Sequence, residues 1–135
     1  MKITYVSQPD DTGCGLACVA MICGVSYNQV KSNMVKLGIF KKDNDFWGTS
    51  FKDIIRTLNS QNIQTVNRRK FKKWRNIPAK VAIVSTNYEQ SGLFHWVVFV
   101  RDNDGFYIYD PAKRRKKIRD LRGKMSGYYI EILSY

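Results

Sequence analysis

The stretch QPDDTGCGLACVAMICG, residues 8–24, decides the fold of this chain. Its first part, QPDDTG, combines Pro, two Asp and Gly, which are residues typical of turns. A helix is therefore predicted to begin near Cys14 or Gly15. Apolar residues follow on most sides of that helix, so we expect it to be buried at the centre of the domain and to end at Gly24.

Two further helices are predicted before the chain changes character. Ser26 with Gln29 three residues later forms a capping-box pattern, and the apolar stripe that follows ends at Gly38. The third helix is expected to start at Thr49 or Ser50 and to present an apolar stripe of its own. After residue 62 the apolar period becomes that of a strand.

Short runs rich in β-branched and aromatic residues predict strands in the second half of the chain, and one more at its start. The turn RDNDG, residues 101–105, predicts a hairpin between two of them. Helices first and an antiparallel sheet second indicate an α+β fold with a cleft between its halves. We expect residues 1–135 to form one domain. The predicted strands are residues 2–6, 63–66, 80–86, 95–100, 105–110 and 128–133.

The chain is strongly basic, with 23 Lys and Arg, 11 Asp and Glu and a formal net charge of +12. The excess is concentrated in the runs RRKFKKWR (68–75) and KRRKKIRDLRGK (113–124). Such runs are most often solvated surface, but they also bind polyanions, and Phe71 and Trp74 would then stack on bases. RNA and an acidic protein, of immunity or carrier type, are candidate partners. The candidate polyanion-binding residues are Arg68, Arg69, Lys70, Lys72, Lys73, Arg75, Lys113, Arg114, Arg115, Lys116 and Lys117.

Cysteine usage and hydropathy limit the class of protein. Cys14, Cys18 and Cys23 lie within ten residues on one predicted helix, which is an odd number and a poor geometry for disulfides, so reduced thiols are expected. No apolar run approaches the roughly 20 residues that a membrane-spanning helix needs. We expect a cytoplasmic protein, or a toxin domain delivered as part of a larger secreted protein.

Cys14 is a candidate nucleophile because of its position. The free N–H groups and the dipole of a helix N-terminus favour the thiolate, which is the reactive form of cysteine. Gly13 and Gly15 remove side chains on both sides of the sulfur and leave the Cys14 amide free to point at a developing oxyanion. Gln8, at the far end of the QPDDTG turn, is expected to fold back and bring its side-chain amide to the same place.

A thiol nucleophile needs a base, and His95 is the one histidine of the chain. With a two-residue loop at Asn103 and Asp104, His95 and Asp110 become diagonal neighbours on one face of a hairpin, roughly 7–8 Å apart at the backbone. Asp110 would then orient one ring nitrogen of His95 while the other faces Cys14. A three-residue loop would break this parity.

Each of these residues also has a simpler interpretation. Taken alone, Cys14 is interpreted most simply as a small buried residue, and Asp110 before Pro111 as a residue that forms a turn. Cys14, Cys18 and His95 are a conceivable metal site, but the cysteine pair lacks a standard zinc-ligand spacing and a fourth ligand is missing. We therefore expect neither metal nor cofactor, with Cys18 in the core. The joint pattern of Gln8, Cys14, His95 and Asp110 favours catalysis.

In these pieces the sequence resembles the bacterial papain-like cysteine peptidases typified by the leader-peptidase domains of bacteriocin exporters. The matching pieces are Gln8 six residues before the cysteine, CGLACVAM, HWVV and YDPA, and they span nearly the whole chain. The resemblance implies a papain-like fold, Cys14 as nucleophile, His95 as base and acid, Asp110 as its orienter, and Gln8 with the Cys14 amide as oxyanion hole. That family usually has Asp directly before the nucleophile, where this chain has Gly13.

Three functions follow, in this order. The first is a papain-like cysteine peptidase or amidase that acts on a peptide or protein. The second keeps the fold but is a toxin or effector domain that cleaves RNA or tRNA, with the basic runs as the binding surface. The third is a non-catalytic binding module in which the thiol site is vestigial.

Overall fold

The computed structural model describes residues 3–87, 90–91, 93–112, 115–118 and 126–133, with backbone alone for 115–118. Three helices come first along the chain and the strands follow, so the predicted α+β class is confirmed. The elements are α1 (Cys14–Cys23), α2 (Tyr27–Lys36), α3 (Phe51–Ser60), β1 (Arg69–Lys70), the 3-10 helix η1 (Trp74–Asn76), β2 (Val81–Thr86), β3 (His95–Asp102), β4 (Gly105–Asp110), β5 (Arg115–Ile118) and β6 (Tyr128–Glu131).

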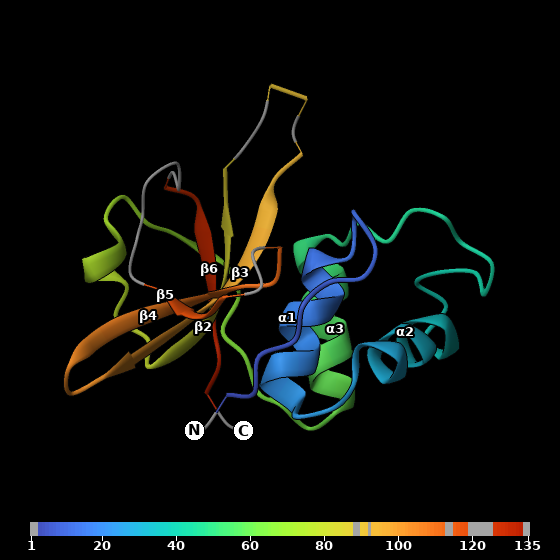
Figure 1. Ribbon diagram of the computed structural model, residues 1–135, viewed down its shortest axis with the longest axis horizontal. Helices are drawn as coiled ribbons and strands as arrows, with labels where there is room; N and C mark the ends of the chain where they lie inside the picture. Colours follow the sequence, from blue (N-terminus) through green and yellow to red (C-terminus); the bar gives the residue numbers. More distant parts are fainter. Residues whose placement is uncertain (1–2, 88–89, 92, 113–114, 119–125, 134–135) are drawn as a thin grey trace.

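One antiparallel sheet runs in the order β1-β6-β2-β3-β4-β5. The helices lie to one side of it and η1 lies to the other (Figure 1). All of β2 is buried because its side chains alternate between two apolar clusters. Val81 and Ile83 pack with the helices, whereas Ala82 and Val84 pack with Trp74 of η1. The sheet is therefore covered on both faces at its centre.

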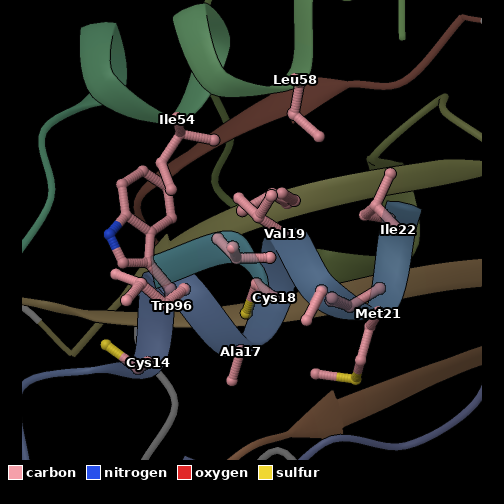
Figure 2. Packing of buried hydrophobic residues seen from close by; sticks show 14 of the residues in the cluster. Cys14, Ala17, Cys18, Val19, Met21, Ile22, Ile54, Leu58 and Trp96 are labelled. Atoms are coloured by element: carbon pink, nitrogen blue, oxygen red, sulfur yellow. The ribbon is translucent and has the colours of Figure 1, made fainter. Parts of the chain in front are cut away.

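Helix α1 lies at the centre of the larger cluster, as its sequence predicts. It contacts α2, α3 and β3, and every residue from Cys14 to Ile22 is buried. Figure 2 shows the Trp96 ring of β3 between Ile54 of α3 and the N-terminal turn of α1. The helix ends at Gly24, whose φ of 68° is left-handed, a conformation that glycine adopts without strain. Apolar burial on all sides thus fixes the axis of the helix that carries Cys14.

The other helices follow their predicted caps. Ser26 Oγ accepts a hydrogen bond from the Gln29 amide at the start of α2. Ser50 and Asp53 form a complete capping box at the start of α3. None of the helices in the described part of the chain combines the length and apolar character needed to cross a membrane.

Two predicted strands are wrong. Residues 3–6 form no strand, because the segment is held at the end of the sheet by single hydrogen bonds and not by a ladder. The Tyr5 hydroxyl donates to the Asp110 carbonyl at 2.7 Å, and the Gln8 amide donates to the Pro111 carbonyl at 3.2 Å. In the predicted strand 63–66 the pairing is reduced to one bridge, between Thr65 and Ile132. The short edge strands β1 and β5, in contrast, were not predicted.

Both glycines beside Cys14 are sites of close packing. A Cβ on Gly13 would overlap the Tyr27 hydroxyl at the start of α2, and a Cβ on Gly15 would overlap Thr49 Oγ1 and lie 3.0 Å from the Trp96 ring. From the sequence, we expect these glycines to leave free space around the Cys14 sulfur. In the structure that space is filled by neighbouring side chains, which fix the start of α1 on two sides.

Replacing Gly13 by Ala is therefore expected to destabilise the fold. Forcing a methyl group against Tyr27 costs about 1–3 kcal/mol in free energy of unfolding. The cost should shrink in a Tyr27→Phe background, because the overlapping hydroxyl is then gone. Urea unfolding of the two single variants and the double variant measures this coupling. Additive changes would contradict the packing argument.

Candidate active site

Cys14 is the first residue of α1. It lies at the edge of the core, and 9% of the residue is exposed. The first intrahelical hydrogen bond runs from the Ala17 amide to the Gly13 carbonyl at 3.1 Å. The amides before Ala17 consequently have no partner within the helix, and they carry the positive end of its dipole. The predicted placement of Cys14 at a helix N-terminus is therefore observed.

His95 and Asp110 meet as the hairpin parity predicts. Asp102 pairs with Gly105, so the loop has two residues, and the register Val98 to Tyr109 makes Asp110 the diagonal neighbour of His95. His95 Nε2 lies 2.7 Å from Asp110 Oδ1. Asp110 is 2% exposed, and the same oxygen accepts the Ala112 amide at 3.0 Å. The carboxylate is thus held on two sides.

The electrostatics of His95 favour its charged form. Burial lowers its pKa, but hydrogen bonds to Asp110 and Cys14, with their negative charges, outweigh burial and raise it to about 9. Because Asp110 engages Nε2, Nδ1 is the ring nitrogen left to interact with Cys14, which lines the same cleft. An imidazolium at neutral pH between a carboxylate and a sulfur is the arrangement that stabilises a thiolate.

Gln8 is placed differently from Cys14 and His95. Its Nε2 donates to the Asp10 and Asp11 carbonyls, at 3.0 Å each, so the amide braces its own turn. Among the described residues, its buried Oε1 has no hydrogen-bond partner. Donation to an oxyanion requires Gln8 to exchange one of these carbonyl bonds for the substrate oxygen.

The turn before Cys14 is tied to α2. Asp10 accepts the Tyr27 hydroxyl at 2.7 Å and pairs with Lys31 at 3.1 Å. The Tyr27 hydrogen bond lowers the pKa of Asp10, and burial raises the pKa of Tyr27. The Lys31 ammonium also lies 4.1 Å from the Trp47 ring centroid. An acidic residue upstream of the nucleophile therefore anchors the turn through α2.

A cleft of about 640 Å³ contains Cys14 and His95. Trp96 lines it, as its position beside the histidine suggests, and Phe46, Leu93 and Phe94 supply further apolar lining. Phe46 and Leu93 are 52% and 56% exposed, which is unusual for large apolar side chains. Sequence reasoning missed both, because each lies in a loop without a periodic pattern.

The described residues of the two basic runs lie at opposite edges of the sheet. Arg68, Arg69, Lys70, Lys72, Lys73 and Arg75 are exposed on and around β1, and Arg115, Lys116 and Lys117 belong to β5. Lys113 and Arg114 lie outside the described residues. The idea that Phe71 and Trp74 stack on bases is wrong. Each is only 6% exposed, because both pack against the sheet.

The remaining cysteines are packing residues. Cys18 is fully buried, and burial, followed by the charges of Cys14 and Asp110, raises its pKa well above the usual value. Burial also raises the pKa of Cys23 to about 11. All three thiols are free, and the described residues contain no cluster of three or more side chains suited to hold a metal ion.

Comparison with known proteins identifies the family. No curated protein matches the chain. A solved structure of a double glycine motif protease from an AMS/PCAT transporter, in complex with the leader peptide, is similar with a TM-score of 0.66 and 18% identity. The match covers 99% of this chain and 93% of that chain, which confirms the papain-like fold. The sequence profile of the peptidase C39 family matches residues 2–132, and the chain therefore belongs to the peptidase C39 family, as the resemblance of its motifs predicts.

Proposed function

We propose that the protein is a cysteine peptidase that cleaves a peptide through Cys14, His95 and Asp110. One observation carries this assignment: a 2.7 Å bond orients His95 on Asp110, and His95 shares a cleft with the Cys14 thiol at the N-terminus of α1. The similar protease was solved with its leader peptide, which supports a peptide as the substrate here. The cleft beside Cys14, with its apolar lining, is the place for that peptide.

The reaction follows from the geometry. The Cys14 thiolate attacks the scissile carbonyl carbon, and its electron pair forms the C–S bond while the carbonyl oxygen becomes an oxyanion. As the tetrahedral intermediate collapses, His95 gives its proton to the leaving amine, and a thioester remains on Cys14. His95 then removes a proton from water, the hydroxide adds to the thioester carbon, the C–S bond breaks to release the carboxylic acid and the Cys14 thiolate, and the imidazolium–thiolate pair is restored.

The oxyanion is stabilised by the Cys14 amide and by Gln8. The amide belongs to the first turn of α1 and has no partner within the helix. Gln8 contributes by releasing one of its two carbonyl bonds when the oxyanion forms. The ribonuclease alternative gains no support, because the aromatic residues of the first basic run pack in the core.

Replacing Cys14 or His95 by Ala is expected to abolish turnover, and Asp110→Ala to reduce it, because His95 then loses the group that orients it. The assay is hydrolysis of a quenched fluorescent peptide with a central Gly-Gly bond. Cys18→Ala and Cys23→Ala are matched controls that should retain cleavage, since neither thiol is placed for attack. Unchanged activity in Cys14→Ala or His95→Ala would overturn the assignment.

The pH dependence should report His95. Its folded pKa of about 9 lies above the ordinary 6.5, so the imidazolium that the ion pair needs persists through neutral pH and is lost as pH rises through about 9. The basic limb of kcat/KM should therefore fall there, and Asp110→Asn should move it to lower pH. Because the chain has one histidine, NMR of the imidazole ring reads the same titration directly. A ring that titrates near its ordinary value would sink this account.

Gln8→Ala should lower kcat by about 10²–10³-fold with little change in KM, since an oxyanion donor acts in the transition state. Because Gln8 also braces its turn, thermal unfolding of the same variant is the control. A loss of stability without a loss of kcat would assign Gln8 to the turn alone.

A further inference from the structure

A second groove, of about 870 Å³, lies along α3 beside residues 65–68. Lys52, Ile55, Arg56 and Asn59 line it from α3, at the spacing of one helix face. Across from them, Arg68 is the cation contributed by the segment that precedes β1. Nothing in the proposed chemistry uses this groove.

The groove adjoins the cleft that holds Cys14. Ser50, the N-cap of α3, lines both hollows. Phe51 of the groove stacks on Phe94 of the cleft, with ring centroids 5.6 Å apart. A peptide bound at Cys14 would reach the groove by passing Ser50.

The charge of the groove has one sign. Lys52, Arg56 and Arg68 are exposed, and among the described residues that line the groove there is no carboxylate. The neighbouring Asp53 carboxylate accepts the Ser50 amide at 3.1 Å, as part of the cap of α3. Like charges four residues apart on a helix, such as Lys52 and Arg56, repel each other. The arrangement favours an anionic occupant.

Arg68 is held in place before any ligand arrives. Its guanidinium lies 4.6 Å from the Phe51 ring centroid and 5.2 Å from that of Tyr128. A guanidinium fixed by stacking keeps its edge available for a carboxylate, which it binds with two parallel hydrogen bonds. Phe51 and Ile55 add an apolar floor between the cations.

We propose that this groove binds an acidic segment of the peptide substrate, remote from the scissile bond, and so selects substrates by charge. Carboxylates of the segment pair with Lys52, Arg56 and Arg68, and an apolar side chain packs on Ile55. The proposal rests on the peptidase function proposed above. A peptide fits better than RNA because the groove's aromatic ring, Phe51, is already covered by Arg68, Phe94 and Trp96.

The test measures binding apart from turnover, with the Cys14→Ala variant. The probes are a fluorescein-labelled 15-residue peptide with Glu and Leu at helical spacing, its Gln counterpart, and a labelled 15-nucleotide single-stranded RNA. In fluorescence anisotropy the Glu peptide should bind about tenfold more tightly than the Gln peptide at low salt, and this advantage should fall as salt rises. Equal binding of the two peptides would overturn the proposal, whether or not the wild type cleaves peptides.

Two variants locate the binding site. Lys52→Gln with Arg56→Gln and Arg68→Gln should weaken binding of the Glu peptide about tenfold. The matched control, Lys72→Gln with Lys73→Gln and Arg75→Gln, removes the same charge around η1 and should change binding by less than twofold. Equal losses of affinity in the two triple variants would show that only the net charge of the protein matters, and would overturn the proposal that the groove is the binding site. RNA binding that depends on the groove, with peptide binding that does not, would overturn it as well.

Charge reversal separates recognition from damage to the fold. In Lys52→Glu with Arg56→Glu, the Glu peptide should lose binding, and a peptide with Lys at the same positions should gain about as much. A misfolded variant would bind neither peptide, and circular dichroism would show it. Failure of the Lys peptide to gain affinity in a folded variant would contradict direct pairing with these two residues.

Discussion

The hydrogen bond between His95 and Asp110 is the interaction on which the site depends, and the sheet sets it. Two residues on neighbouring strands become diagonal partners only if the loop between them has the right parity. The loop at Asn103 and Asp104 has two residues, and so the 2.7 Å bond forms. One inserted residue would turn Asp110 to the other face and leave His95 without its orienter.

The second constraint is where α1 begins. Tyr27 packs closely against Gly13, and Thr49 and Trp96 pack closely against Gly15, so that neither position has room for a Cβ atom. The Tyr27 hydroxyl occupies the space beside Gly13, and its hydrogen bond goes to Asp10. Asp10 also pairs with Lys31, so the turn before α1 is held through α2.

Sequence reasoning succeeded where a local pattern determines structure. The caps of α2 and α3, the end of α1 at Gly24 and the diagonal pairing of His95 each depend on a few neighbouring residues. It failed at residues 3–6, where β-branched and aromatic residues predicted a strand, but single hydrogen bonds from Tyr5 to Asp110 and from Gln8 to Pro111 took the place of a ladder. It also missed Phe46 and Leu93, because loop residues gain their role from tertiary placement alone.

Charge shows the same limit. The two basic runs dominate the sequence, yet their described residues fall on opposite edges of the sheet, and the aromatic residues of the first run pack in the core. The cations of the groove come from separate parts of the chain, with Lys52 and Arg56 isolated among apolar and polar residues of α3. A run of like charge is a property of the sequence, whereas a binding site needs charges that converge on a hollow. In this fold the charges converge along α3, in a groove that adjoins the cleft of the thiol, because Ser50 at the start of the helix lines both hollows.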